Sequence, residues 1–311
     1  MRSAPHDLPA TATTRPAARR RAATAAPAGV GEWTSQALVH LVVVLMALAW
    51  VLPTLGLLVS SLRPAPDVAR TGWWTVFANP FDLTRWTLAN YRHVLGQQGL
   101  AQAFLNSFII TVPATVLPIL VASFAAFAFA WLDFPGRSWL FLVVVGFLVV
   151  PLQMTFVPIL KIYSETGLAG TFVGIWLAHT GYGLPFAVYL MRNFFGSLPG
   201  ELFESAYIDG ASPLSAFFRL ALPMSTPALA SLAIFQFLWV WNDLLVALIY
   251  LGGGARTGPL TLKLSSLVGS YGQEWHVLTA AAFISMLVPV ALFFALQRYF
   301  VRGILAGAVK G

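Results

Sequence analysis

The sequence of 311 residues contains no cysteine. A disulfide framework, a thiolate zinc site, an iron–sulfur cluster and a cysteine nucleophile are therefore excluded. Charged residues are also scarce, at 9% of the chain against about 25% in a typical soluble domain. So few charges cannot cover a surface that faces water, and 58% of the residues are apolar. The composition therefore indicates a protein embedded in a lipid bilayer.

Lysine is nearly absent and occurs only as Lys161, Lys263 and Lys310. A phosphate-binding loop needs a glycine-rich turn that ends in Gly-Lys-Ser/Thr before a helix, and none of these lysines stands in that setting. The chain therefore cannot bind ATP in that way.

The net charge of +7 does not predict a nucleic-acid partner, because the only dense basic cluster lies near the N-terminus. It consists of Arg2, Arg15, Arg19, Arg20 and Arg21. Residues 1–33, which contain this cluster, are rich in Ala, Pro, Thr and Arg and show no apolar periodicity. Such a segment cannot bury enough apolar surface to offset the entropy of ordering, so we expect a disordered tail.

Six apolar runs are long enough to cross a bilayer, for which a helix needs about 20 residues. Each run is continuous instead of alternating, which favours helices over barrel strands. The chain is therefore expected to be an all-α integral membrane protein, with one six-helix domain over residues 34–311. The predicted spans are residues 37–60, 104–131, 138–158, 169–192, 226–250 and 277–298.

Basic residues predict the orientation of these spans. The five arginines of the tail favour a cytoplasmic N-terminus. Six spans then return the C-terminus to the cytoplasm and place the long loop of residues 193–225 on the same side.

This loop carries the signals of two short helices with a bend between them. Ser197 and Pro199 fit the start of a first helix, and Gly210 fits its left-handed end. Ser212 followed by Pro213 starts a second helix, which Pro223 is expected to end. A simpler reading is an amphipathic hairpin on the membrane surface with four aromatic side chains in lipid: Phe203, Tyr207, Phe217 and Phe218.

The spacing of acidic, small and proline residues in this loop resembles the EAA loop of ABC importer permeases. The resemblance implies that the first helix is a coupling helix, which docks on a cytoplasmic ATPase, and we refer to residues 193–225 as the coupling loop. Ser205 stands where alanine is usual in that family. The residues expected to serve coupling are Glu204, Ser205, Ala206, Asp209, Gly210, Ala211, Leu222 and Pro223.

Four further segments look like sugar-importer permeases, in particular the smaller permease of the maltose and alpha-glucoside type. They are Asn106–Ser107, the LDFPGR turn at 132–137, the WVWND segment at 239–243 and the C-terminal run from Gln297. This resemblance implies a type I importer fold in the inner (cytoplasmic) membrane. It also implies three partners: a second homologous permease, an ABC ATPase dimer that uses ATP and Mg²⁺, and an extracytoplasmic sugar-binding protein. The implied cargo is an oligosaccharide, with an alpha-glucoside as the favoured case.

Several polar residues fall within the predicted spans, where an unpaired polar group costs several kcal/mol. They either line a translocation path or form hydrogen bonds that hold the helices together, and both readings stay open. The residues are Gln153, His179, Tyr182, Asn242 and Asp243. His179 has no second histidine or carboxylate at ligand spacing, so no metal site is expected.

Two other functions are alternatives to the importer. An ion-coupled secondary transporter is expected to need buried carboxylates in several spans, and only Asp243 is a candidate. An intramembrane hydrolase would want a serine in a Gly-x-Ser-x-Gly type of turn near His179, and no such turn is present.

Overall fold

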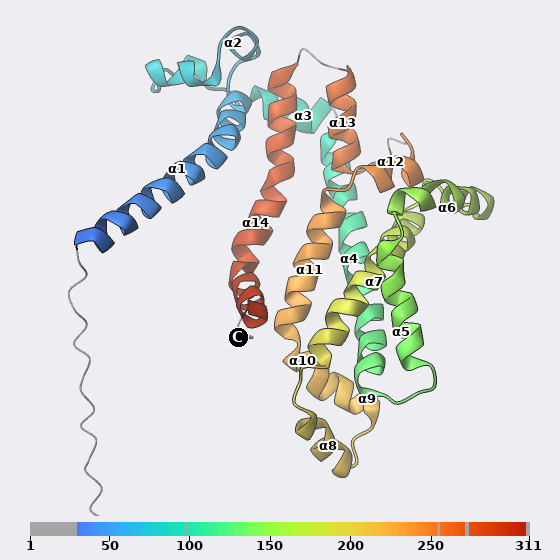
Figure 1. Cartoon of the computed structure of the whole chain (residues 1–311). Coiled ribbons are helices and arrows are strands. Elements are labelled where there is room, and N and C mark those ends of the chain that lie inside the picture. The colour runs from blue at the N-terminus through green and yellow to red at the C-terminus, as the bar shows by residue number, and fades with distance from the viewer. Residues whose placement is uncertain (1–29, 98, 254–255, 271–273, 309–311) are drawn as a thin grey trace, which may run out of the picture. The chain divides into compact units, whose positions relative to one another are not determined.

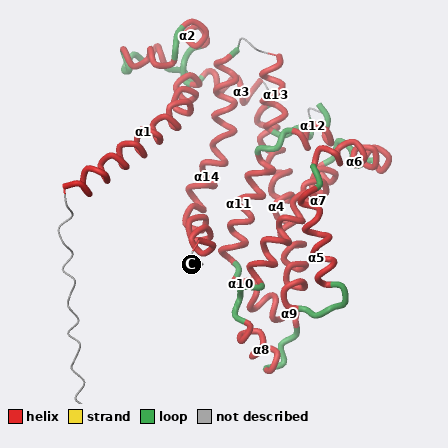
Figure 2. Tube along the Cα trace, viewed as in Figure 1, coloured by secondary structure: helices red, strands yellow, loops and turns green. Residues whose placement is uncertain are grey.

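A computed structural model describes residues 30–97, 99–253, 256–270 and 274–308. Every regular element in these ranges is a helix, as predicted (Figure 2). The predicted tail lies outside the described residues up to residue 29, and helix α1 (Val30–Ser61) begins before the predicted boundary at residue 33. The chain divides into two units, Met1–Leu52 and Pro53–Gly311.

Helix α1 is apolar enough to cross a membrane over Gln36–Ser61. This stretch matches the predicted span at 37–60.

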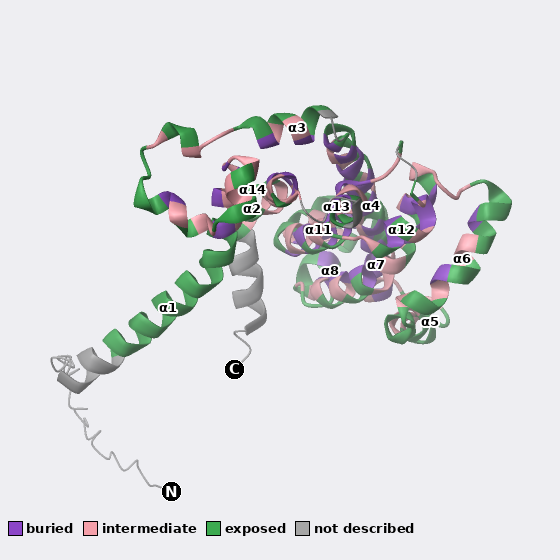
Figure 3. Cartoon of the chain, turned by 90° about the horizontal axis from the view of Figure 1, so that it is seen from above, coloured by how far each residue is buried: buried purple, intermediate pink, exposed green. Residues whose placement is uncertain are grey.

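The second unit is built around three helices that lie side by side: α4 (Leu100–Trp131), α7 (Phe172–Phe195) and α11 (Thr226–Trp241) (Figure 1). The helix α14 (Trp275–Ala308) packs against α11. Ala114, Ala122 and Ala126 of α4 are fully buried, and such small residues let helices approach closely. Figure 3 shows the buried residues gathered where these helices face one another.

The predicted span at 138–158 is wrong as a single straight helix. The chain forms α5 (Arg137–Gly146), a short 3₁₀ turn η3 (Phe147–Val149) and α6 (Leu152–Thr166), with a bend of 99°. Pro151 explains the break, because it lacks an N–H and forces the preceding Val150 into an extended conformation, observed at ψ 118°.

The predicted span at 226–250 is also broken, between the end of α11 at Trp241 and the start of α12 (Leu245–Leu251). The Asp243 carboxylate accepts hydrogen bonds from the backbone N–H groups of Val246 (3.4 Å) and Ala247 (3.0 Å). This side chain caps the start of α12 and competes with a continuous helix.

By length and composition, three helices in the described ranges can cross a membrane, and two bent pairs raise that number to five. The bent pairs are Arg137–Val149 with Leu152–Thr166 and Pro213–Met224 with Thr226–Trp241. The predicted fourth span coincides with α7, which is not among the five. His179, Tyr182 and the glycines of α7 lower its hydropathy.

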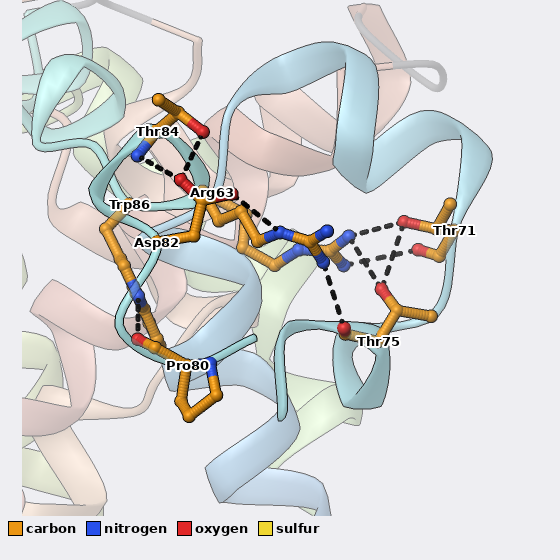
Figure 4. A network of polar contacts seen from close by, with 8 residues as sticks. Arg63, Thr71, Thr75, Pro80, Asp82, Thr84 and Trp86 are labelled. Carbon is orange, nitrogen blue, oxygen red and sulfur yellow. Dashed lines mark hydrogen bonds and ion pairs between the residues drawn. The ribbon is translucent and has the colours of Figure 1, made fainter. Parts of the chain in front are cut away.

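The segment that follows α1 is held together by Arg63, which is 3% exposed. This segment contains α2 (Ala65–Arg70), two 3₁₀ turns η1 (Trp73–Ala78) and η2 (Leu83–Arg85), and α3 (Ala89–Gln97). The Arg63 guanidinium donates to the backbone oxygens of Asp67 and Thr71, both at 3.3 Å, and to the hydroxyls of Thr71 and Thr75 (Figure 4). The charge of Arg63 is therefore satisfied by neutral oxygen atoms.

A second arginine closes the same network. Arg85 donates to the backbone oxygen of Thr75 at 3.2 Å and pairs with Asp82 at 3.3 Å. The hydroxyl and the N–H of Thr84 donate to Asp82, and these hydrogen bonds lower the pKa of its carboxyl group. Asp82 therefore stays ionised beside Arg85.

The loop that leads into α13 (Leu260–Ser270) is anchored on the first turns of α4. Asn106 Nδ2 donates to the backbone oxygens of Arg256 (2.9 Å) and Gly258 (3.0 Å), and Ser107 Oγ accepts from the Leu260 N–H at 2.8 Å. Both side chains are at most 2% exposed. The Asn106–Ser107 pair thus joins segments about 150 residues apart in the sequence.

We predict that Arg63→Met loosens residues 64–86. The substitution removes the guanidinium that donates to Asp67, Thr71 and Thr75, which should cost about 2 kcal/mol of local stability. Limited digestion with chymotrypsin should then cut at Trp73, Trp74 and Phe77 at least ten times faster, since about 1.4 kcal/mol is a factor of ten. The control is Arg70→Met, because Arg70 is exposed in the same segment. Equal cutting rates in the two variants would contradict the role of Arg63.

Candidate functional site

The coupling loop forms the predicted elbow of two helical segments at one end of the second unit (Figure 1). The first segment is α8 (Gly200–Ile208), and the second runs without interruption through α9 (Pro213–Ala216), the π-turn η4 (Phe217–Ala221) and α10 (Leu222–Met224). Gly210 adopts a left-handed φ of 84°, and the Ala211 N–H donates to the Ala206 oxygen at 2.9 Å. The predicted left-handed end of α8 is confirmed.

The structure tests three further predictions about the elbow. Ser212 caps the second segment as predicted, since its Oγ accepts from the Ser215 N–H at 3.2 Å. Ser197 does not cap α8, because its hydroxyl donates to the Phe194 oxygen at the end of α7. The second segment ends at Met224, one residue after Pro223, and the chain bends by 74° before α11, so the predicted end is confirmed to within one residue.

Phe203 fixes α8 to the membrane helices. Its side chain is 1% exposed and stacks on Trp131, the last residue of α4, with ring centroids 4.0 Å apart. The Trp131 indole N–H donates to the backbone oxygen of Phe195 at the end of α7, at 3.1 Å. One aromatic pair therefore ties α8 to the ends of two core helices.

Phe217 fixes the second segment in the same way. It is 2% exposed and packs against Phe124 and Phe127 of α4, with ring centroids 4.7 and 5.3 Å apart. The alternative of a surface hairpin with Phe203 and Phe217 in lipid is therefore wrong. Tyr207 and Phe218, by contrast, are exposed.

The residues predicted to serve coupling divide into an exposed set and a supporting set. Glu204, Ser205, Asp209, Gly210 and Pro223 are exposed, whereas Ala206, Ala211 and Leu222 are half-buried beneath them. Ile208 adds an apolar side chain that is 86% exposed. The loop therefore presents carboxylates beside an apolar side chain on a braced support.

Two of the five residues predicted within the path contact each other. His179 Nε2 lies 3.9 Å from Asp243 Oδ2, and His179 is 1% exposed. Tyr182 instead joins a second group: its hydroxyl lies 2.6 Å from the Tyr250 hydroxyl and 2.8 Å from Thr155 Oγ1. Gln153 and Asn242 are exposed, and Asn242 donates to the Leu238 oxygen of its own helix.

Tyr182 also lines a cavity of about 300 Å³ between α7 and α11. The other lining residues are Gly183, Phe186, Phe235, Gln236 and Trp239. We call this the aromatic cavity. Phe186, Phe235 and Gln236 were not predicted from the sequence, where the available signal was Gln236, an amide inside an otherwise apolar run.

The walls of the aromatic cavity are held in place by neighbours. Gln236 Nε2 donates to the Ala114 oxygen of α4 at 3.2 Å. A Cβ on Gly183 would lie 2.6 Å from Gln236 Nε2, so a larger residue would displace this amide. The edge of the His179 ring meets Trp239 with centroids 5.5 Å apart. His179 and Gly183 thus position the polar and aromatic walls.

Within the described ranges, no three His, Asp or Glu side chains gather closely enough to hold a metal ion.

Comparison with known proteins agrees with these features. Residues 100–306 match the family described as "Binding-protein-dependent transport system inner membrane component". The chain is 60% identical to the osmoprotective compounds uptake permease protein GgtD of Synechocystis, over 88% of this chain and 91% of the relative. It is 42% identical to the alpha-glucoside transport system permease protein AglG of Rhizobium meliloti, over 88% of this chain and 97% of the relative.

Among solved structures, a chain of a bacterial ABC transporter involved in the import of the acidic polysaccharide alginate has the same fold. Its TM-score is 0.71 at 18% identity, over 88% of this chain and 98% of that chain. The predicted type I importer fold and the predicted permease resemblance are confirmed. This chain belongs to the family of inner membrane components of binding-protein-dependent transport systems.

Proposed function

We propose that this chain is the permease subunit of an ATP-driven importer of small uncharged carbohydrates. The observation that carries the proposal is the coupling loop, an exposed carboxylate surface braced by Phe203 and Trp131 on α4 and α7. The proposed partners are a second homologous permease, a cytoplasmic ABC ATPase dimer that uses ATP and Mg²⁺, and an extracytoplasmic sugar-binding protein. The coupling loop and both termini face the cytoplasm in this proposal.

Coupling works through rigid contacts. When the ATPase dimer closes, it displaces α8, which carries Glu204 and is followed directly by Asp209. Because Phe203 is buried against Trp131, α8 cannot move without moving the ends of α4 and α7. Glu204 anchors the docking by charge-assisted hydrogen bonds, which are stronger than neutral ones.

The cargo is proposed from the relatives and from the aromatic cavity. One relative is named for the uptake of osmoprotective compounds and the other for the transport of alpha-glucosides. A small uncharged alpha-glucoside fits both names. The aromatic cavity has no charged lining residue. Aromatic faces suit the C–H faces of a sugar ring, while Gln236 and the Tyr182 hydroxyl can hydrogen-bond to its hydroxyl groups.

The other polar residues within the spans have supporting roles in this proposal. Asp243 holds the start of α12 and contacts His179, which in turn positions Trp239. Gln153 and Asn242 remain candidates for the path, since both are exposed. The capping role of Asp243 accounts for a carboxylate in the membrane without ion coupling, which weighs against the secondary transporter.

We predict that Gly210→Val abolishes ATP turnover stimulated by the binding protein in the reconstituted complex, while the chain still inserts into membranes. A β-branched residue at φ 84° costs at least about 1–2 kcal/mol, which shifts the end of α8. Gly200→Val is the matched control. Neither Gly200 nor Gly210 has a neighbour within 4 Å of an added Cβ, and only Gly210 has a positive φ. Normal turnover with Gly210→Val would contradict this role.

We predict that Trp239→Ala lowers uptake of a labelled neutral alpha-glucoside, such as trehalose, about tenfold in proteoliposomes. The loss reflects about 1–1.5 kcal/mol of aromatic contact with the cargo. Basal ATP turnover should stay unchanged, because Trp239 lies near the C-terminal end of α11, whereas the coupling loop joins the N-terminal end of that helix. Trp275→Ala, at another exposed indole, is the control. Uptake equal to that of the unmodified chain would refute cargo contact in the aromatic cavity.

A further inference from the structure

A second cavity, of about 260 Å³, lies between α4, α5 and α7. Its lining residues are Phe129, Arg137, Ser138, Phe141, Leu142 and Arg192. We call it the arginine cavity. It shares no residue with the aromatic cavity. It belongs to the end of the unit that carries the coupling loop, since Arg192 lies in the last turn of α7 and α8 follows directly.

The two arginines of this cavity keep unused hydrogen-bond donors. Arg137 Nη1 donates to the Leu132 oxygen (3.0 Å) and to Asp133 Oδ1 (2.9 Å), which leaves Nε and Nη2 free in the described part of the chain. The guanidinium of Arg192 lies 5.0 Å from the centroid of the Phe141 ring, and it makes no hydrogen bond or ion pair with any described residue. A cation over an aromatic face is held in place by that contact.

The charge balance of the arginine cavity is positive. Two guanidinium groups line it, its lining contains no carboxylate, and Asp133, the ion-pair partner of Arg137, has a side chain that is 98% exposed. Asp133 therefore offers Arg137 only a solvent-screened partner. The Ser138 hydroxyl adds a third donor in the first turn of α5. Such a donor set fits a phosphate, which arginine binds through paired N–H groups.

The remaining lining is apolar apart from Ser138. Phe129 and Phe141 form one wall, and Leu142 of α5 is 59% exposed. Trp139, adjacent to the cavity, is 72% exposed, and exposed indoles favour the boundary between hydrocarbon and water. A free phosphate ion would gain nothing from this apolar half, whereas a phospholipid has both a phosphate and acyl chains.

We propose that Arg137 and Arg192 bind the phosphate of an anionic membrane phospholipid, with its acyl chains along Leu142 and the outer face of α5. Basic cavities between membrane helices on the cytoplasmic side are typical sites for anionic headgroups. A zwitterionic lipid fits less well, because its own cation would approach two arginines. The occupant would tie the start of α5 to the last turn of α7, beside Trp131 and the coupling loop.

The test is native mass spectrometry of the full chain in mild detergent, titrated with phosphatidylglycerol or with phosphatidylcholine of the same acyl chains. We expect phosphatidylglycerol to bind at least ten times more tightly. Arg137→Gln and Arg192→Gln should each weaken its binding about tenfold, as for the loss of a charge-assisted hydrogen bond. Arg219→Gln is the matched control, because Arg219 is an exposed arginine at the same end that does not line the cavity.

Two further experiments distinguish lipid binding from an effect of misfolding and from binding of soluble phosphate. Arg137→Lys and Arg192→Lys keep the charge and should retain the preference for phosphatidylglycerol. Equal binding of the two lipids, or unchanged binding in the double Gln variant, would overturn the proposal. Displacement of phosphatidylglycerol by millimolar inorganic phosphate would overturn the lipid as the source of the phosphate.

Discussion

The contact between Trp131 and Phe203 is the interaction on which the coupling account depends. A nine-residue helix such as α8 has little stability of its own in water, so tertiary contacts must hold it in place. Phe203 supplies that contact by stacking on the last residue of α4, and the Trp131 indole N–H adds a hydrogen bond to the end of α7. The same end of the bundle carries Phe217, packed against Phe124 and Phe127. The loop is therefore continuous with the helical core, and a displacement of α8 must reach the core.

Polar groups within the spans obey a second constraint, since a low-dielectric interior offers no water to satisfy them. Asp243 meets it by capping α12, and the hydroxyls of Tyr182, Tyr250 and Thr155 meet it by bonding to one another. These solutions require helices that are interrupted near the path. The break at residues 242–244 allows Asp243 to face the N–H groups of α12. The bend at Pro151 separates α5 from α6, and α6 carries Thr155. The breaks in the helices thus allow the polar groups to find hydrogen-bond partners.

Much of this fold was predictable from the sequence, because continuous apolar runs of about 20 residues are a strong signal. The runs at 37–60, 104–131 and 277–298 correspond to helices able to cross a membrane. The two breaks were missed although local signals existed, at Val150–Pro151 and at the WVWND segment. The length of an apolar run does not indicate whether the helix bends, whereas a proline or a capping carboxylate changes the backbone conformation directly.

The candidate site shows the same division between local and distant information. Gly210 and Ser212 act on their own backbone, and the elbow they define was predicted correctly. The burial of Phe203 was not predictable, because its partner Trp131 lies 72 residues earlier and the stack exists only after the helices have packed. The aromatic cavity was missed for a related reason. Phe186, Phe235 and Trp239 look like ordinary apolar residues of a span until α7 and α11 lie side by side.

The most direct measurement of the central claim is thiol cross-linking from α8, for which the absence of cysteine makes the chain well suited. Ser205→Cys places one thiol on the exposed face of α8 with almost no change in shape, and Ser266→Cys places one on the exposed face of α13 as a control. In cells that make the whole transporter, the account predicts that a short thiol-reactive cross-linker joins position 205, and not position 266, to the ATPase. Cross-linking of position 205 to no ATPase, in a complex that still transports, would contradict the account.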